Sequence, residues 1–126
     1  MPTEIVIETE DRPGVIAEIG QLFGEARVNI VAAAAFAHER IGYLHFVVDR
    51  ADRAVAALKR GGWSVRETRE VLAVTLEDRP GELGRYARRL SDAGVNITAL
   101  YVAGDRAGDK ELIVAVDDLA AAQRAR

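Results

Sequence analysis

The sequence predicts an α+β protein made of two tandem β-α-β-β-α-β units, the second of which lacks its last strand. Two motifs recur at one offset, apolar residues alternate before each copy of the first motif, and apolar residues follow it with helical spacing. The 126 residues fit one ordinary domain or two unusually small ones. We therefore place the first unit at residues 1–68 and the second at residues 69–126.

The repeat rests on two short motifs. The pentapeptide Glu-Asp-Arg-Pro-Gly occupies residues 10–14 and 77–81, and the block Ala-x-Val-Asn-Ile occupies residues 26–30 and 93–97. One offset of 67 residues relates both pairs. Because two separate motifs share this offset, the chain contains an internal duplication.

Each copy begins with a strand and a helix. Ile5 and Ile7 alternate with their neighbours, which predicts a strand with one buried face, and Leu72 and Val74 repeat that phase. After each Pro-Gly, apolar residues with helical spacing predict a helix that buries the same face in both units. These residues are Ile16, Ile19, Gly20, Phe23 and Ala26 in the first unit and Leu83, Tyr86, Ala87, Leu90 and Ala93 in the second.

Two apolar strands follow the helix in each unit. In each unit the two apolar runs lie on either side of a turn. We expect strands at residues 29–37 and 42–48 around a turn at 38–41, and at residues 96–103 and 110–116 around a turn at 104–109.

A second helix follows Asp49 and ends at Gly61-Gly62, and Asp117 begins the matching helix of the second unit. Residues 63–66 read as a fourth strand, so the first unit has the ferredoxin-like order of elements. The inward residues of the second helix are expected to be Ala54, Val55 and Leu58.

The second unit is shorter than the first. The counterpart of Trp63 would fall beyond Arg126, which predicts that the last strand is missing. No Gly or Pro separates residues 63–66 from residues 71–76, which favours one long strand that joins the two sheets. Because an open sheet edge is prone to aggregation, we expect a homodimer that covers it.

Composition excludes several classes of function. The net charge is −3 and the basic residues form no stripe, which argues against a nucleic-acid partner. The absence of cysteine excludes disulfides, thiolate zinc sites and a cysteine nucleophile, and we expect neither a metal nor a cofactor. The acidic, alternating N-terminus is unlike a signal peptide, and no apolar run reaches the roughly 18 residues of a membrane span, so we expect a cytoplasmic protein without membrane contact.

The Asp-Arg-Pro-Gly motif lies where a strand ends and a helix begins. Pro suits the first helical turn and Gly lets another molecule approach the backbone. The first N–H groups of each helix, at residues 14–16 and 81–83, then suit a carboxylate. Asp11 or Asp78 beside them suits an ammonium group. The two receptors together describe a free α-amino acid.

A purely structural interpretation stays open for the same residues. Asp before Pro-Gly is also a good helix start, with the carboxylate as a cap or as a partner of the helix dipole. Asn29 and Asn96 each open a strand after a helix, where Asn commonly closes a turn, although its amide could equally contact a ligand.

Both copies resemble the ACT domain, a regulatory module of amino-acid metabolism. A strand, Asp-Arg-Pro-Gly followed by Val-Ile or Glu-Leu, a helix and Val-Asn-Ile carry the resemblance, which covers nearly the whole chain. It departs at Arg27, which replaces the usual Gly before Val28, and at the missing strand. The resemblance implies ligands between paired modules, held by the strand-to-helix loop of one module and residues near the second strand of its neighbour. The candidate ligand-binding residues are Asp11, Arg12, Pro13, Gly14, Val15 and Asn29, with Asp78, Arg79, Pro80, Gly81, Glu82, Leu83 and Asn96 in the second copy.

The resemblance implies a non-catalytic, allosteric sensor, similar to stand-alone two-module proteins, that acts on an enzyme of amino-acid metabolism. One alternative is a regulatory subunit or interaction protein that docks on such an enzyme and binds no ligand itself. Another is an enzyme of the same fold, such as an acylphosphatase. Arg12 and Arg79 lie in suitable loops for that chemistry, but the Gly-Val-x-Phe-Arg pattern of that family is absent.

Overall fold

The computed structural model describes residues 1–125. The chain divides into two compact units. The N-terminal unit is Pro2–Arg69, and the C-terminal unit begins at Glu70 and also includes Met1. None of the helices in the described residues is long and apolar enough to cross a membrane.

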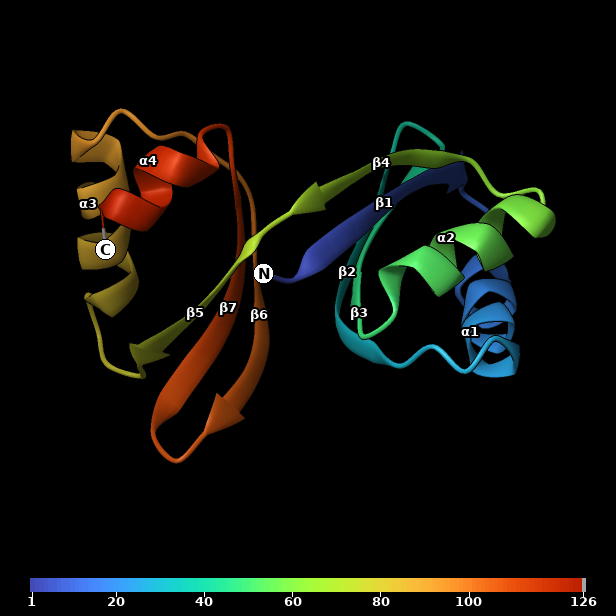
Figure 1. Ribbon diagram of the computed structural model, residues 1–126, viewed down its shortest axis with the longest axis horizontal. Coiled ribbons are helices and arrows are strands. Elements are labelled where there is room, and N and C mark those ends of the chain that lie inside the picture. The colour runs from blue at the N-terminus through green and yellow to red at the C-terminus, as the bar shows by residue number, and fades with distance from the viewer. Residues whose placement is uncertain (126) are drawn as a thin grey trace. The chain divides into compact units, whose positions relative to one another are not determined.

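The N-terminal unit is a four-stranded sheet with both helices on one face (Figure 1). Its strand order is β2-β3-β1-β4, and β3 runs antiparallel to both β1 and β2. This order confirms the predicted ferredoxin-like unit. The elements are β1 (Thr3–Glu10), α1 (Val15–Glu25), β2 (Ile30–His38), β3 (Ile41–Val48), α2 (Ala51–Arg60) and β4 (Val65–Glu70).

The core of this unit lies between the sheet and the two helices. Ile5 and Ile7 of β1 pack there with Ile19 and Phe23 of α1. The ring of Phe23 meets that of Phe46 edge to face at 5.4 Å between centroids, an arrangement that aromatic pairs prefer. The core therefore fixes α1, and with it the loop that precedes α1.

The prediction of one buried face for β1 is wrong, because Glu4 and Val6 are buried as well as Ile5 and Ile7. Glu4 is compatible with burial because its carboxylate is paired. Arg69 Nε lies 2.6 Å from one carboxylate oxygen, and His45 Nδ1 lies 3.2 Å from the other. A buried charge with such partners avoids most of the penalty of desolvation.

The predicted inward face of the first helix is also wrong at two positions in each unit. Ile16 and Leu83 are 52% and 44% exposed, and Gly20 and Ala93 are exposed as well. The helices begin at Val15 and Glu82, after a glycine in the left-handed conformation. The inward stripe of α1 therefore runs through positions four residues apart, which are Val15, Ile19 and Phe23.

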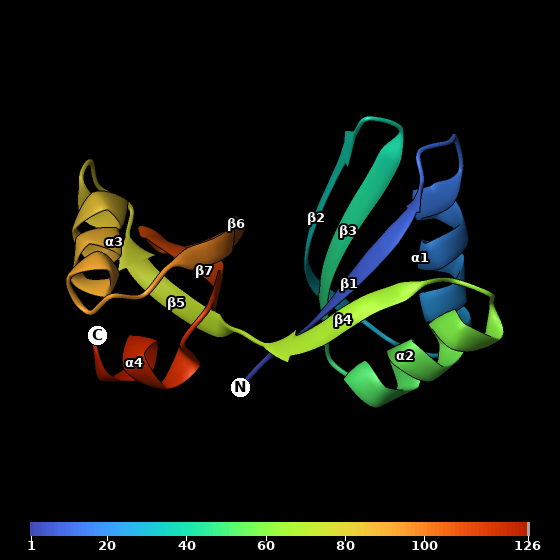
Figure 2. The same ribbon diagram turned by 90° about the horizontal axis from the view of Figure 1, so that it is seen from above.

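The C-terminal unit repeats this arrangement without a counterpart of β4 among the residues that the structure describes. Its sheet has the order β5-β7-β6, again with the helices on one face, as Figure 2 shows from above. The predicted absence of the last strand is thus confirmed within that range. The elements are β5 (Leu72–Glu77), α3 (Glu82–Asp92), β6 (Ile97–Arg106), β7 (Asp109–Val116) and α4 (Leu119–Arg124).

The β6–β7 turn is shorter than predicted. It comprises Ala107 and Gly108 alone, because β6 and β7 continue their ladder as far as Arg106 and Asp109. A register shift between Val102 and Gly104 gives β6 one residue more than β2. Beyond it, equivalent positions in the two units differ by 68 residues and not by 67.

Three other predicted boundaries move. Helix α4 is capped by Asp118, whose carboxylate accepts from the N–H of Ala121, and not by Asp117. The fourth strand begins at Val65, after Trp63. The expected long strand is wrong, because β4 and β5 belong to different sheets and Val71 between them has no ladder partner in either. The side chain of Val71 is fully buried.

Candidate ligand-binding site

The loop between β1 and α1 is held by its backbone. The N–H of Asp11 donates a 3.0 Å hydrogen bond to the carbonyl oxygen of Arg40, at the tip of the β2–β3 hairpin. Gly14 then adopts φ +94°, a conformation that is strained for any residue with a Cβ. These two features bring the start of α1 beside the end of β2.

The equivalent loop of the C-terminal unit has the same construction. The N–H of Asp78 donates to the carbonyl oxygen of Gly108 at 2.8 Å, and Gly81 has φ +89°. A Cβ added at Gly81 would lie 2.9 Å from the guanidinium of Arg85, which can move aside, so the positive φ is what favours glycine at this position. Pro13 and Pro80 each precede the left-handed glycine.

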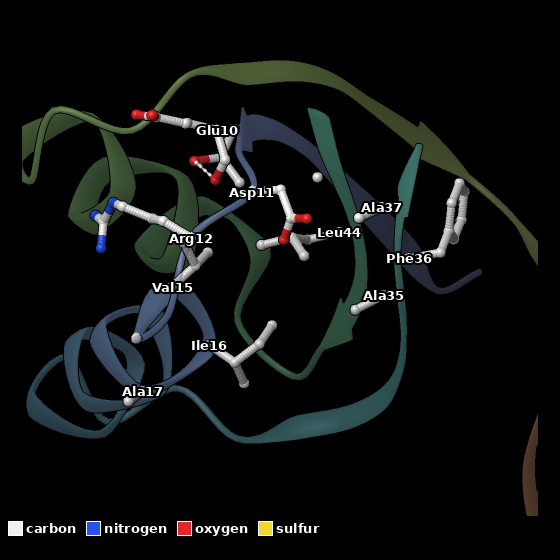
Figure 3. A pocket seen from close by; sticks show the side chains of 13 residues that line it. Glu10, Asp11, Arg12, Val15, Ile16, Ala17, Ala35, Phe36, Ala37 and Leu44 are labelled. Carbon is white, nitrogen blue, oxygen red and sulfur yellow. Dashed lines mark hydrogen bonds between the residues drawn. The ribbon is translucent and has the colours of Figure 1, made fainter. Parts of the chain in front are cut away.

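A cavity of about 360 Å³ lies between the first loop and the end of the β2–β3 hairpin (Figure 3). Of the predicted site residues, it brings together four from the first copy: Asp11, Arg12, Gly14 and Val15. The other lining residues were not predicted as site residues; they are Thr9, Glu10, Ile16, Ala17, Ala35, Phe36, Ala37, Gly42 and Leu44.

The two charged side chains of the motif point in different directions. The Asp11 carboxylate points toward the strands, whereas Arg12 extends away from the cavity (Figure 3). Arg12 Nη1 lies 2.5 Å from Glu18 Oε2, and this hydrogen bond raises the pKa of Arg12 and lowers the pKa of Glu18. Within residues 1–125, no hydrogen bond or ion pair engages the Asp11 carboxylate. Asp11 is therefore available to an incoming cation, whereas the guanidinium of Arg12 is paired with Glu18.

The start of α1 supplies the complementary polarity. Its N-cap is Gly14, and no side chain caps the helix, so the interpretation of Asp11 as a side-chain cap is wrong. The first N–H groups of a helix have no acceptor within the helix, and the helix dipole adds partial positive charge there. Because Val15 and Ile16 line the cavity, this polarity lies beside the Asp11 carboxylate.

Most of the strand residues that line the cavity are apolar, and Thr9 and Glu10 of β1 are the polar ones. Ala35, Ala37 and Gly42 carry small side chains or none, and Leu44 lies between them and the core. Ile16 points into the space from α1 (Figure 3). Sequence reasoning missed Ile16 as a site residue because helical spacing assigned it to the core. One signal could have revealed it: both Ile16 and its counterpart Leu83 are bulky, yet they lie outside the stripe of residues spaced four apart that faces the core.

Comparison with known families decides the nature of this unit, because residues 3–59 match the model of the ACT domain. Residues 3–59 are an ACT domain. Among curated proteins, no sequence matches the chain.

Solved structures share the fold over nearly the whole chain. A Bacteroides thetaiotaomicron protein superposes with a TM-score of 0.88 at 20% identity, covering 98% of this chain and 84% of its own. The regulatory subunit of aspartate kinase from Thermus thermophilus, in its ligand-free form, gives 0.74 at 18% identity and 98% and 89% coverage. The corresponding subunit from Thermus flavus gives 0.73 at 18% identity, with 98% and 88% coverage. At these identities the likeness establishes the fold.

Asn29 lies far from the ACT-domain cavity. It precedes β2, whose other end contributes Ala35 and Ala37, so the two ends are about 25 Å apart at the usual rise of a strand. The N–H of Asn29 donates to Asp49 Oδ1 at 2.8 Å, and that of Asn96 donates to Asp117 Oδ1 at 2.9 Å. Both asparagines thus lie in turns that an aspartate carboxylate closes. Sequence reasoning did not identify these two aspartates as their partners.

In the C-terminal unit, the charged residues of the motif engage one another. Arg79 contacts Glu77 and Glu82, each at 2.9 Å, and Glu82 Oε1 also lies 2.5 Å from Arg85 Nη2. Hydrogen bonds from Arg85 and then from Arg79 lower the pKa of Glu82. Asp78 differs from Asp11, because Lys110 Nζ lies 3.5 Å from its carboxylate. Leu83 is exposed beside them, like Ile16 in the ACT domain.

The described residues contain no group of three or more His, Cys, Asp and Glu side chains that could hold a metal ion. His38 is exposed, and its Nε2 lies 3.7 Å from the carboxylate of the neighbouring Glu39.

Proposed function

We propose that this chain is a regulatory module that binds a free α-amino acid in the cavity of the ACT domain. The observation that carries the proposal is the meeting of two opposite polarities in one cavity: the unengaged carboxylate of Asp11 and the N-terminal end of α1. The ammonium group of the ligand pairs with Asp11, and its carboxylate accepts from the N–H groups of Val15 and Ile16.

The lining also indicates a class of amino acid. Beyond Asp11 the ligand side chain meets Ala35, Ala37 and Leu44, with Ile16 opposite. These side chains are apolar, and such a surface favours an apolar ligand side chain and penalises a buried charge, while Thr9 and Glu10 of β1 also line the cavity. We therefore propose an aliphatic amino acid such as valine, leucine or isoleucine.

A second copy of the chain is proposed to close the cavity. β2 is an edge strand of its sheet, and Phe36 and Val31 on it are 56% and 54% exposed. An edge strand with large exposed apolar residues is a natural place for pairing between chains. Antiparallel pairing of two β2 strands would also bring Asn29 of one chain toward the loop of the other, a role that its own unit does not permit. A monomeric mass in sedimentation equilibrium at micromolar concentration would contradict the homodimer.

The regulatory role draws on the fold shared with aspartate kinase regulatory subunits. The proposed target is an enzyme of amino-acid metabolism, and the module itself carries out no reaction. In this proposal the concentration of the amino acid determines how much of the module is ligand-bound. Ligand binding to the module then alters the activity of the enzyme that the module contacts.

The experiment is a thermal-shift screen of the whole chain against the twenty common amino acids, followed by calorimetry. A ligand at about a hundred times its dissociation constant should stabilise the folded chain by roughly 2.7 kcal/mol. Asp11→Asn should abolish the shift, and Asp92→Asn, at the exposed end of α3, serves as the matched control. An unchanged affinity in Asp11→Asn would remove Asp11 from the site.

The exposed apolar residues of β2 favour one alternative, an interaction protein that docks on an enzyme through this strand and binds no amino acid. A flat screen with a folded sample, together with stoichiometric recovery of one enzyme on the immobilised chain, would support it. Phe36→Ser should then abolish that recovery, because it removes the largest exposed apolar side chain on β2.

A further inference from the structure

We infer that Lys110 occupies the ammonium site of the C-terminal loop from within the chain, so that each chain binds one amino acid and not two. The inference rests on the proposed function of the ACT-domain cavity. It concerns which of the two repeated loops takes the ligand.

Lys110 stands where the ACT domain has Gly42. In the N-terminal unit Gly42 pairs with Thr9 across the sheet, and in the C-terminal unit Lys110 pairs with Leu76, the counterpart of Thr9. The register of the two sheets therefore makes Gly42 and Lys110 equivalent. One unit has no side chain at this position and the other has a long cationic one.

The ammonium group of Lys110 lies between two carboxylates. Its Nζ is 2.5 Å from Asp105 Oδ1 and 3.5 Å from Asp78 Oδ2. Asp105 belongs to the end of β6 and Asp78 to the strand-to-helix loop, so the contact ties the loop to the hairpin by a side chain as well as by the backbone. Asp78 thus already has the cation that Asp11 lacks.

A ligand at Asp78 would have to compete with this intramolecular cation. Its ammonium group would approach a carboxylate whose charge is partly compensated, and it would be repelled by Lys110 at close range. The pair within the chain also has a high effective concentration, which a free ligand does not match. The attraction between a ligand ammonium group and the loop aspartate is therefore much weaker at Asp78 than at Asp11.

The strand side of the second loop is bulkier as well. Ala35 pairs with Leu44, and the equivalent pair in the C-terminal unit is Val102 with Leu112. One strand position earlier on the same face, Ala33 is replaced by Leu100. Larger side chains at both positions reduce the space that a ligand side chain would need beside Leu83.

The test is the stoichiometry of binding, measured by calorimetry on the full chain with L-valine, L-leucine and L-isoleucine as separate probes. We expect one site per chain, lost in Asp11→Asn and retained with unchanged affinity in Asp78→Asn. Thermal unfolding of both variants checks that each remains folded. Lys110→Ala is expected to release Asp78 and to add a second, weaker binding event.

The outcomes separate the inference from the proposed function. Two sites per chain, or loss of binding in Asp78→Asn, would overturn the inference and leave amino-acid binding in place. A single event in Lys110→Ala would overturn the role of Lys110. If the wild-type chain binds none of the three probes, the aliphatic ligand and this inference fall together, whereas the twenty-member screen decides whether another amino acid binds.

Discussion

The backbone N–H of Asp11 donates a 3.0 Å hydrogen bond to the carbonyl oxygen of Arg40. This bond joins the strand-to-helix loop to the tip of the β2–β3 hairpin, and these two segments are the walls of the cavity. Because the backbone makes the connection, the carboxylate of Asp11 stays available. The site is thus positioned before any ligand arrives, which reduces the ordering that binding requires.

The left-handed glycine at the start of α1 gives a first prediction. Gly14→Ala should destabilise the chain by about 1 kcal/mol, because φ is +94° there and a Cβ would be strained. Gly20→Ala is the matched control, since Gly20 lies inside α1 with no neighbouring atom within 4 Å of an added Cβ. That change should stabilise the chain by about 0.5–1 kcal/mol. Urea unfolding of the two variants measures both signs, and destabilisation by Gly20→Ala would contradict the placement of α1.

Arg27 offers the opposite change. It has φ +58°, and its counterpart Gly94 has φ +76°. The expected left-handed turn is therefore kept in the first unit although the residue is not glycine. Arg27→Gly should relieve that strain and stabilise the chain by about 1 kcal/mol. If the urea midpoint of Arg27→Gly were equal to or lower than that of the wild type, the Arg27 side chain would stabilise the chain by at least as much as the backbone strain destabilises it.

Ile16 and Phe23 lie on the same helix and should separate binding from stability. Phe23→Ala should destabilise the chain by about 3–5 kcal/mol because it leaves a cavity in the core. Ile16→Ala should change the unfolding free energy by less than about 0.5 kcal/mol and weaken amino-acid binding several-fold. Leu83→Ala, equally exposed in the other unit, is the control and should leave the affinity unchanged. Calorimetry would contradict this account if Ile16→Ala bound as tightly as the wild type.

The fold could be predicted from the sequence because the repeat supplies each element twice, in register. The candidate loops followed from the same repeat, and the structure brings Asp11, Arg12, Gly14 and Val15 to one cavity. The distance between Asn29 and the strand-to-helix loop could not be predicted, because it depends on the direction in which β2 runs. The position of Lys110 opposite Asp78 depends on a one-residue shift in β6, which a constant 67-residue offset conceals. The pairing of Arg12 with Glu18 could not be predicted either, because sequence spacing does not determine which neighbouring carboxylate an arginine contacts.

The charged cluster of α3 predicts a pH effect. Hydrogen bonds from Arg85 and Arg79 lower the pKa of Glu82 below its usual 4.5 in the folded chain. A lowered folded pKa contributes stability above the unfolded value, and this contribution is lost as the pH falls through the folded pKa. Glu82→Gln should therefore make stability fall less steeply below about pH 4.5. Glu25→Gln, a carboxylate hydrogen-bonded by Gln21, is the control. If wild type and Glu82→Gln lost stability identically at acid pH, the stabilising role of the Glu82 cluster would be contradicted.

The most direct test of the central claim is an amide chemical-shift map of the labelled chain, titrated with the aliphatic amino acid that gives the largest thermal shift. The account predicts saturable shifts at residues 11–17 and at Ala35–Ala37, with residues 78–83 unchanged. Perturbations gathered at residues 78–83, or spread evenly over the chain, would contradict binding in the cavity beside Asp11.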